Sequence, residues 1–118
     1  KAQHFPKIQK RISDFYMLGW GVSTLDSHYV FTYLFHGEGS WNGIGYNNPR
    51  VNEITRLIET ETDIPKRTAL IDEAWQIIKK EMPYLPIHHQ VLGWSMKENV
   101  DVPIAADDHL RPRFIVFK

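Results

Sequence analysis

A serine, an aspartate and a histidine lie close together in one short segment, and these residue types can carry out nucleophilic catalysis. Ser23, Asp26 and His28 supply a hydroxyl, a carboxylate and an imidazole. A serine hydrolase places its nucleophile on a strained turn, often within a Gly-x-Ser-x-Gly motif, which this chain lacks. With six histidines in the chain, triples of this kind also arise by chance. A small α+β serine hydrolase using Ser23 is therefore an alternative hypothesis, not the main one.

Two further motifs could hold a metal ion or a phosphate. His88 and His89 are adjacent, and neighbouring side chains on a strand point to opposite faces, so the pair cannot chelate one ion. Residues 37–45 hold four glycines but lack the Lys-Ser/Thr pair of a phosphate-binding loop. We expect a hydrogen-bonded core histidine at His89, a surface loop at residues 37–45, and no metal or cofactor.

Two tryptophans stand next to glycines and could face a ligand. Trp20 lies between Gly19 and Gly21, where an apolar run meets a helix start, so its ring can turn towards a cleft. The alternative is that Trp20 belongs to the core and Asp26 is only a helix cap. Trp41, within the glycine-rich segment, either packs on a satellite part of the core or covers a site.

Composition excludes several classes of function. The chain has 118 residues, equal numbers of basic and acidic residues (14 each) and no cysteine. The length suits one domain, and the charge balance argues against a nucleic-acid or anionic-membrane partner. No apolar run is long enough to span a bilayer, and the lack of cysteine excludes disulfides and thiolate chemistry.

Capping residues and apolar spacing predict the helices. Asn48-Pro49 and Asp63 with Pro65 are typical helix starts, in which a side chain accepts backbone hydrogen bonds and proline occupies the first turn. Pro83 ends the last helix. The expected helices are a short or broken one within residues 1–12, followed by 27–35, 49–60 and 64–81.

Apolar runs predict the strands. Residues 14–20 are aromatic-rich and apolar, which indicates a buried strand, and residues 85–91 alternate as a half-buried strand with a bulge near Gly93. A polar loop at residues 105–113 precedes an apolar strand at 114–117. The elements together predict an α/β (mixed α+β) fold, with a small mixed sheet packed by three to four helices.

Several short motifs follow one another over almost the whole chain. They are Leu18-Gly19-Trp20, Asp26 at a helix start, Gly-Tyr-Asn-Asn-Pro-Arg-Val at 45–51, Asp63 with Arg67, and Glu-Met-Pro-Tyr-Leu-Pro-Ile at 81–87. In this order they resemble the C-terminal part of the family-5 extracellular solute-binding proteins, the dipeptide- and oligopeptide-binding receptors of bacterial ABC transporters.

The resemblance implies a receptor without catalytic activity. Such a receptor traps a peptide or related small solute between two lobes and delivers it to ABC permease subunits in the membrane. Family members are several hundred residues long, so residues 1–118 would form a single C-terminal fragment of one lobe of a periplasmic-binding-protein-like fold. The implied location is the periplasm or the outer, membrane-associated surface of a bacterium.

The resemblance also implies where a ligand would bind. Trp20 matches the family tryptophan that lines the cleft wall. Peptide-binding members have an aspartate in place of Ser23, where it pairs with the ligand's α-amino group, so either Asp26 substitutes for it or the ligand is an opine, sugar, metal chelate or modified peptide. The expected ligand-binding residues are Trp20, Gly21, Val22, Ser23, Asp26, Trp41 and Tyr46.

One expectation and one alternative function follow if residues 1–118 stand alone. Residues 114–117 would expose apolar surface and an unpaired strand edge, which predicts dimerisation or strand exchange between copies. A structural or interaction domain without a solute is the remaining alternative.

Overall fold

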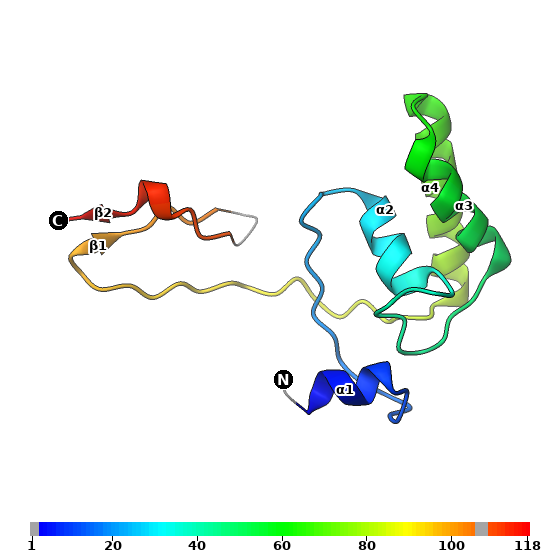
Figure 1. The fold of residues 1–118 in the computed structure, drawn as a ribbon, viewed down its shortest axis with the longest axis horizontal. Coiled ribbons are helices and arrows are strands. Elements are labelled where there is room, and N and C mark those ends of the chain that lie inside the picture. Colours follow the sequence, from blue (N-terminus) through cyan, green and yellow to red (C-terminus); the bar gives the residue numbers. More distant parts are fainter. Residues whose placement is uncertain (1–2, 106–108) are drawn as a thin grey trace. The chain divides into compact units, whose positions relative to one another are not determined.

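The chain consists of two compact units. The structure, a computed structural model, describes residues 3–105 and 109–118. The units are Lys1–Pro86, which holds the long helices, and Ile87–Lys118, which holds a small sheet (Figure 1). The expected mixed class of helix and sheet is confirmed, but the sheet is antiparallel and two-stranded where a mixed sheet was expected.

The helices form where the sequence predicts them. Pro6 lies in the first turn of the first helix, where its missing N–H leaves no helical hydrogen bond unmade. The second helix continues without a break as a π-helix, closed by a hydrogen bond of 2.7 Å from His36 N to Phe31 O. The helices are α1 (His4–Gln9), α2 (Ser27–Val30), the π-helix η1 (Phe31–Phe35), α3 (Pro49–Thr60) and α4 (Ile64–Glu81).

The predicted caps are confirmed. Asn48 Oδ1 accepts hydrogen bonds from the backbone N–H groups of Arg50 and Val51, at 2.9 and 3.2 Å. Asp63 Oδ1 accepts one from Lys66 N at 2.9 Å. These contacts satisfy amides that a helix start leaves without partners. α4 ends at Met82, whose φ of 46° is left-handed.

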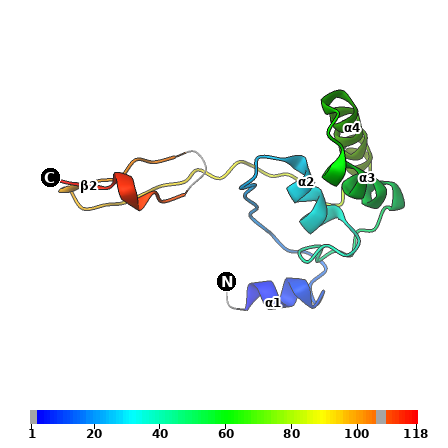
Figure 2. The same ribbon diagram turned by 45° about the horizontal axis from the view of Figure 1, so that its top comes forward.

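One hydrophobic core joins η1, α3 and α4. Figures 1 and 2 show α3 lying beside α4, and the buried core residues come from facing sides of these elements. Arg50 on α3 adds a two-pronged ion pair to Glu73 on α4, with N–O distances of 2.6 and 2.7 Å. The buried core residues are Phe31, Leu34, Phe35, Val51, Ile54, Ile58, Ala74 and Ile78.

The strand predicted at residues 14–20 is absent, although the segment is extended. Tyr16, Leu18 and Trp20 are half-buried, whereas Phe15 is 86% exposed and Met17 is also exposed. Side chains therefore alternate as they would on a strand. A strand also requires a hydrogen-bonded neighbour, and no segment among residues 3–105 and 109–118 pairs with this one.

The strand predicted at residues 85–91 is also wrong. This segment is extended, no described segment pairs with it, and Leu85, Ile87 and Val91 are exposed. His89 is exposed as well, which corrects the expectation of a core histidine. Gly93 forms no bulge, because the described residues around it belong to no pair of hydrogen-bonded strands. The alternation predicted a buried face, but the residues described here contain nothing that covers it.

The second unit is a short antiparallel hairpin. β1 (Val100–Asp101) pairs with β2 (Val116–Phe117), with Val100 opposite Phe117 and Asp101 opposite Val116. The strand predicted at residues 114–117 is thus confirmed only in its last two positions, because Phe114 belongs to the 3₁₀ helix η2 (Pro112–Phe114). β1 was not predicted. Of the expected loop at 105–113, residues 106–108 lie outside the described residues.

Candidate functional site

Trp20 lies in a group of aromatic rings at the edge of the core. Its ring centroid is 5.9 Å from that of Tyr29, 6.2 Å from Tyr33 and 6.0 Å from Trp41. Tyr29 and Tyr33 are one helical turn apart across α2 and η1, with centroids 4.8 Å apart. We call these four residues the aromatic cluster. The structure thus brings together Trp20 and Trp41, two of the predicted site residues.

The indole of Trp20 presents carbon atoms to its surroundings. The residue as a whole is half-buried and packs against the core. Its Nε1 atom is fully covered and has no hydrogen-bond partner among the described residues. The exposed part of this side chain is therefore apolar. Trp20 combines core packing with an open surface, so its role in a site stays a prediction.

Trp41 packs as a satellite of the core, one of the two alternatives left open by the sequence. Its backbone N–H donates to Tyr33 O at 3.1 Å, and its carbonyl accepts from the Tyr84 hydroxyl at 3.4 Å. Its ring also meets Phe5 edge-on, with centroids 5.3 Å apart. Trp41 is therefore held by α1, η1 and the segment after α4.

The segment after Trp20 forms an exposed turn. Leu25 N donates to Val22 O at 3.2 Å, which places the exposed Ser23 within the turn. A Cβ atom added to Gly21 would meet nothing within 4 Å, so the surface beside Trp20 is open there. Gly21, Val22 and Ser23 are therefore accessible from solvent or from a bound molecule.

The carboxylate of Asp26 is already paired. Its Oδ1 accepts from His28 N at 2.8 Å, which confirms the predicted helix cap. The same atom accepts from Arg67 Nη2 at 3.0 Å, and Arg67 Nε donates to Ile58 O at 3.0 Å. The hydrogen bond from Arg67, followed by that from His28 N, lowers the pKa of Asp26 below its ordinary value of 3.8. Asp26 is ionised at neutral pH, and Arg67 compensates its charge.

Tyr46 lies apart from the aromatic cluster in its contacts. Its hydroxyl donates to Glu81 Oε2 at 2.6 Å, and its ring meets Phe35 edge-on at 6.1 Å between centroids. Burial, then the hydrogen bond to Glu81, raises the pKa of the Tyr46 phenol. These contacts fix the loop before α3 to the end of α4.

The three residues considered for serine hydrolysis do not form a triad. Asp26 contacts the backbone N–H of His28 and not its ring. The His28 Nε2 atom lies 3.3 Å from the hydroxyl of Thr32. In the part of the chain that the structure describes, no group of three or more His, Cys, Asp or Glu residues could hold a metal ion.

Two hollows lie outside the predicted ligand-binding residues, although one of them contains His28 of the Ser-Asp-His triple. A polar hollow of about 400 Å³ borders the π-helix, and its residue Tyr33 also belongs to the aromatic cluster. The spacing of His28, Thr32 and His36 at one-turn intervals was the available signal for it. The hollow is lined by His28, Thr32, Tyr33, His36, Glu38, Gly39, Ser40, Thr55, Arg56 and Glu59.

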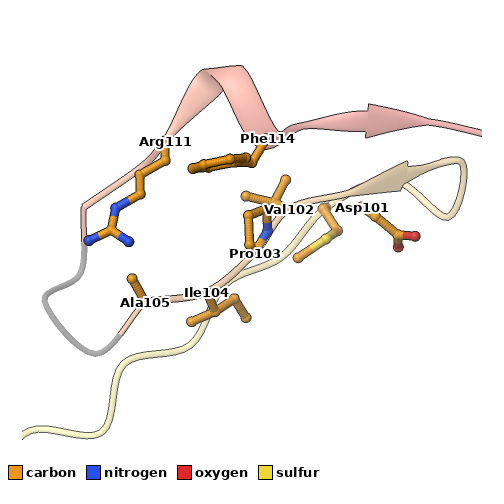
Figure 3. Close-up of a pocket in the computed structure, with 8 residues that line it drawn as sticks. Asp101, Val102, Pro103, Ile104, Ala105, Arg111 and Phe114 are labelled. Carbon is orange, nitrogen blue, oxygen red and sulfur yellow. The ribbon is translucent and has the colours of Figure 1, made fainter.

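A second, mainly apolar hollow of about 910 Å³ lies within the hairpin unit. Figure 3 shows Phe114 lying over Val102 and Pro103, with Arg111 on the same side as Phe114. None of the seven predicted site residues lines either of these two hollows.

The chain is similar to part of a known binding protein. Over 84 residues it is 32% identical to the oligopeptide-binding protein OppA of Bacillus subtilis (strain 168). The match covers 70% of this chain and 15% of OppA, so the chain spans a small part of its relative's length. No family model and no solved structure matches the chain. This finding relates the chain to a binding protein and not to an enzyme. Among the described helices, none combines the length and apolar character needed to cross a membrane.

Proposed function

We propose that the protein is a non-catalytic receptor for a peptide or related small solute. In this proposal, residues 1–118 form part of one lobe of a two-lobed receptor of the family-5 solute-binding class. The observation that carries the proposal is the similarity to an oligopeptide-binding protein over 84 residues. The order of short motifs from Leu18-Gly19-Trp20 to the segment after α4 agrees with it.

The aromatic cluster and the turn beside it are the proposed contact surface. Trp20 offers apolar surface, Gly21 leaves open space, and Ser23 supplies an exposed hydroxyl. Ligand sites combine apolar walls with a few placed polar groups, which fits this set. Trp41 supports Trp20 through an edge-on ring contact, whereas Asp26 and Tyr46 act through the helices that they fix.

The proposal carries consequences for partners and location. A receptor of this class works with ABC permease subunits and resides in the periplasm or on the outer, membrane-associated surface of a bacterium. Its opposite lobe closes over the solute by a hinge motion. No cofactor is needed, because binding alone is the function.

Isothermal titration of the complete protein with a set of tripeptides and other small solutes tests the proposal. Replacement of Trp20 by alanine should weaken the tightest interaction at least about tenfold, since a buried aromatic anchor is worth more than 1 kcal/mol. Phe15→Ala, an exposed aromatic residue on the opposite side of the same segment, is the matched control and should leave affinity unchanged.

One result would contradict the proposed contact surface, and another would contradict the receptor function. Unchanged affinity in the Trp20→Ala variant would remove this residue from the site. Covalent labelling of Ser23 by a serine-hydrolase probe would favour the enzyme alternative instead.

A further inference from the structure

The charge state of the solute can be inferred from the surface around Trp20. We infer that the end of the solute that packs on Trp20 is uncharged, as in a peptide whose amino end is acylated. This inference rests on the proposed function above. It concerns the chemistry of the ligand at the aromatic cluster.

The ring partners of Trp20 carry no charge. They are Tyr29, Tyr33 and Trp41. The polar hollow that shares Tyr33 contains Glu38 and Glu59, but it also contains Arg56. The rings that contact Trp20 therefore supply no counter-charge to an ammonium group.

Asp26 follows the turn closely in sequence, but Arg67 already compensates its charge. One oxygen of its carboxylate accepts both the helix-capping hydrogen bond and the hydrogen bond from Arg67. Arg67 is further held by the carbonyl of Ile58, so the guanidinium is fixed beside Asp26. A ligand ammonium placed at Asp26 would meet the positive charge of Arg67 at the same time.

Ser23 supplies a hydroxyl where a carboxylate would be needed. A hydroxyl can accept a hydrogen bond from an ammonium, but it cannot compensate the charge. Taking a charged group out of water without a partner is far more costly than burying a neutral one. A capped amino end avoids that cost and can still hydrogen-bond with the serine.

Aromatic rings can themselves attract a cation, but the geometry of this cluster does not favour it. The rings of Trp20, Tyr29 and Tyr33 lie against one another, with tilts of 40 to 56° and centroids 4.8 to 6.2 Å apart. The three rings therefore contact one another, which leaves less of their faces open to a cation. Even when desolvated, a single ring face gives a cation–π attraction of only about 2 kcal/mol, which is less than the cost of burying an unpaired charge.

Titration of the complete protein with trialanine and with N-acetyl-trialanine tests this inference. At about pH 6 the free amino group is charged, since its ordinary pKa is about 7.7–8.0. We expect the acetylated peptide to bind at least about tenfold more tightly. Ser23→Asp adds the missing carboxylate and should shift the affinity ratio towards trialanine by about tenfold. Asparagine has the same shape as aspartate but no charge, so Ser23→Asn should leave the affinity ratio of the two peptides unchanged.

The outcomes separate the inference from the proposed function. Equal or tighter binding of trialanine by the unmodified protein would overturn the inference and leave the receptor function standing. An affinity ratio that does not respond to Ser23→Asp would place the amino end elsewhere and also overturn it. Absence of binding for both probes and for every peptide in the set would overturn the peptide-receptor proposal itself.

Discussion

The Oδ1 atom of Asp26 accepts hydrogen bonds from His28 N and Arg67 Nη2, so one carboxylate joins the start of α2 to α4. Asparagine also caps helices well, so Asp26→Asn should remove the ion pair and keep the cap. The two side chains are 37% and 27% exposed, and solvent screening limits the loss to about 0.5–1 kcal/mol of unfolding free energy. Asp26→Ala should lose about 1 kcal/mol more, because the cap goes too. Urea denaturation measures both.

The contribution of Asp26 should depend on pH with a defined sign. Arg67 and His28 N lower the pKa of the folded-state carboxyl below 3.8. A lowered pKa means that the stabilisation is fully present above the unfolded value and is lost as the pH falls through the folded value. The difference in stability between the wild type and Asp26→Asn should therefore be constant near neutral pH and shrink below about pH 4. A difference that does not begin to shrink as the pH falls below about 4 would assign it to another group.

Leu25 offers a second test at the level of a single residue. Its φ of 55° is left-handed, and its side chain is 89% exposed. The left-handed conformation costs a non-glycine residue about 1–2 kcal/mol, partly offset by the greater unfolded-state freedom of glycine. Leu25→Gly should therefore stabilise the chain by about 0.5–1 kcal/mol in thermal or urea unfolding. Leu57→Gly, in the regular helix α3, should instead destabilise it by about 1 kcal/mol.

Predictability at this scale depends on how far apart the partners are in sequence. The caps by Asn48 and Asp63 could be predicted, because the donor N–H groups lie within three residues of the acceptor. The pairing of Asp26 with Arg67, 41 residues away, could not be predicted from spacing. The contact of Trp20 with Trp41 could not be predicted from spacing either, although both residues were expected in the site.

At the scale of elements, the glycine-rich loop owes its shape to one buried amide. Asn42 Nδ2 donates to the carbonyls of His36 and Tyr46 at 3.0 and 2.6 Å, and Asn42 Oδ1 accepts from Tyr46 N at 2.9 Å. Asn42 is itself buried. A single side chain thus fastens both ends of the loop, which composition alone predicted only as irregular.

Asn42→Asp should therefore destabilise the chain severely. The new carboxylate would place a charged oxygen opposite two carbonyl oxygens, at a cost of roughly 3 kcal/mol or more in unfolding free energy. Asn47→Asp is the matched control. Asn47 is exposed, and its side chain acts as an acceptor, from Asn52 Nδ2 at 2.7 Å, so a carboxylate can make the same contact. Equal stabilities of the two variants in chemical denaturation would show that the hydrogen bonds of Asn42 do not hold the two ends of the loop together.

The helices were predictable, whereas two of the three predicted strands were wrong and the third was confirmed only at Val116 and Phe117, for a physical reason. The helix α3 can be read from Asn48, Pro49 and the apolar residues after them, because its hydrogen bonds are local. The segments at 14–20 and 85–91 have strand-like alternation, but a strand forms only with a partner. No described segment pairs with either of them, and their apolar side chains stay exposed.

At the scale of the whole molecule, the two units differ in how much they bury. The core residues all belong to the first unit. None of the described residues of the hairpin unit is buried. A two-stranded hairpin without a core is at most marginally stable in water, so its apolar side chains are available for further contacts.

The exposed hairpin leads to the last prediction, that copies of residues 1–118 associate with one another. Val116 and Phe117 form a two-residue strand with one partner, β1, and Phe117 is 75% exposed. An apolar strand with a free edge pairs readily with another chain. Light scattering across micromolar concentrations should show dimers or larger species of this polypeptide. Phe117→Lys should reduce association by charging that edge, whereas Ile64→Lys, at an exposed apolar position on α4, should not. Monomers at every concentration would show that the hairpin edge is closed in solution.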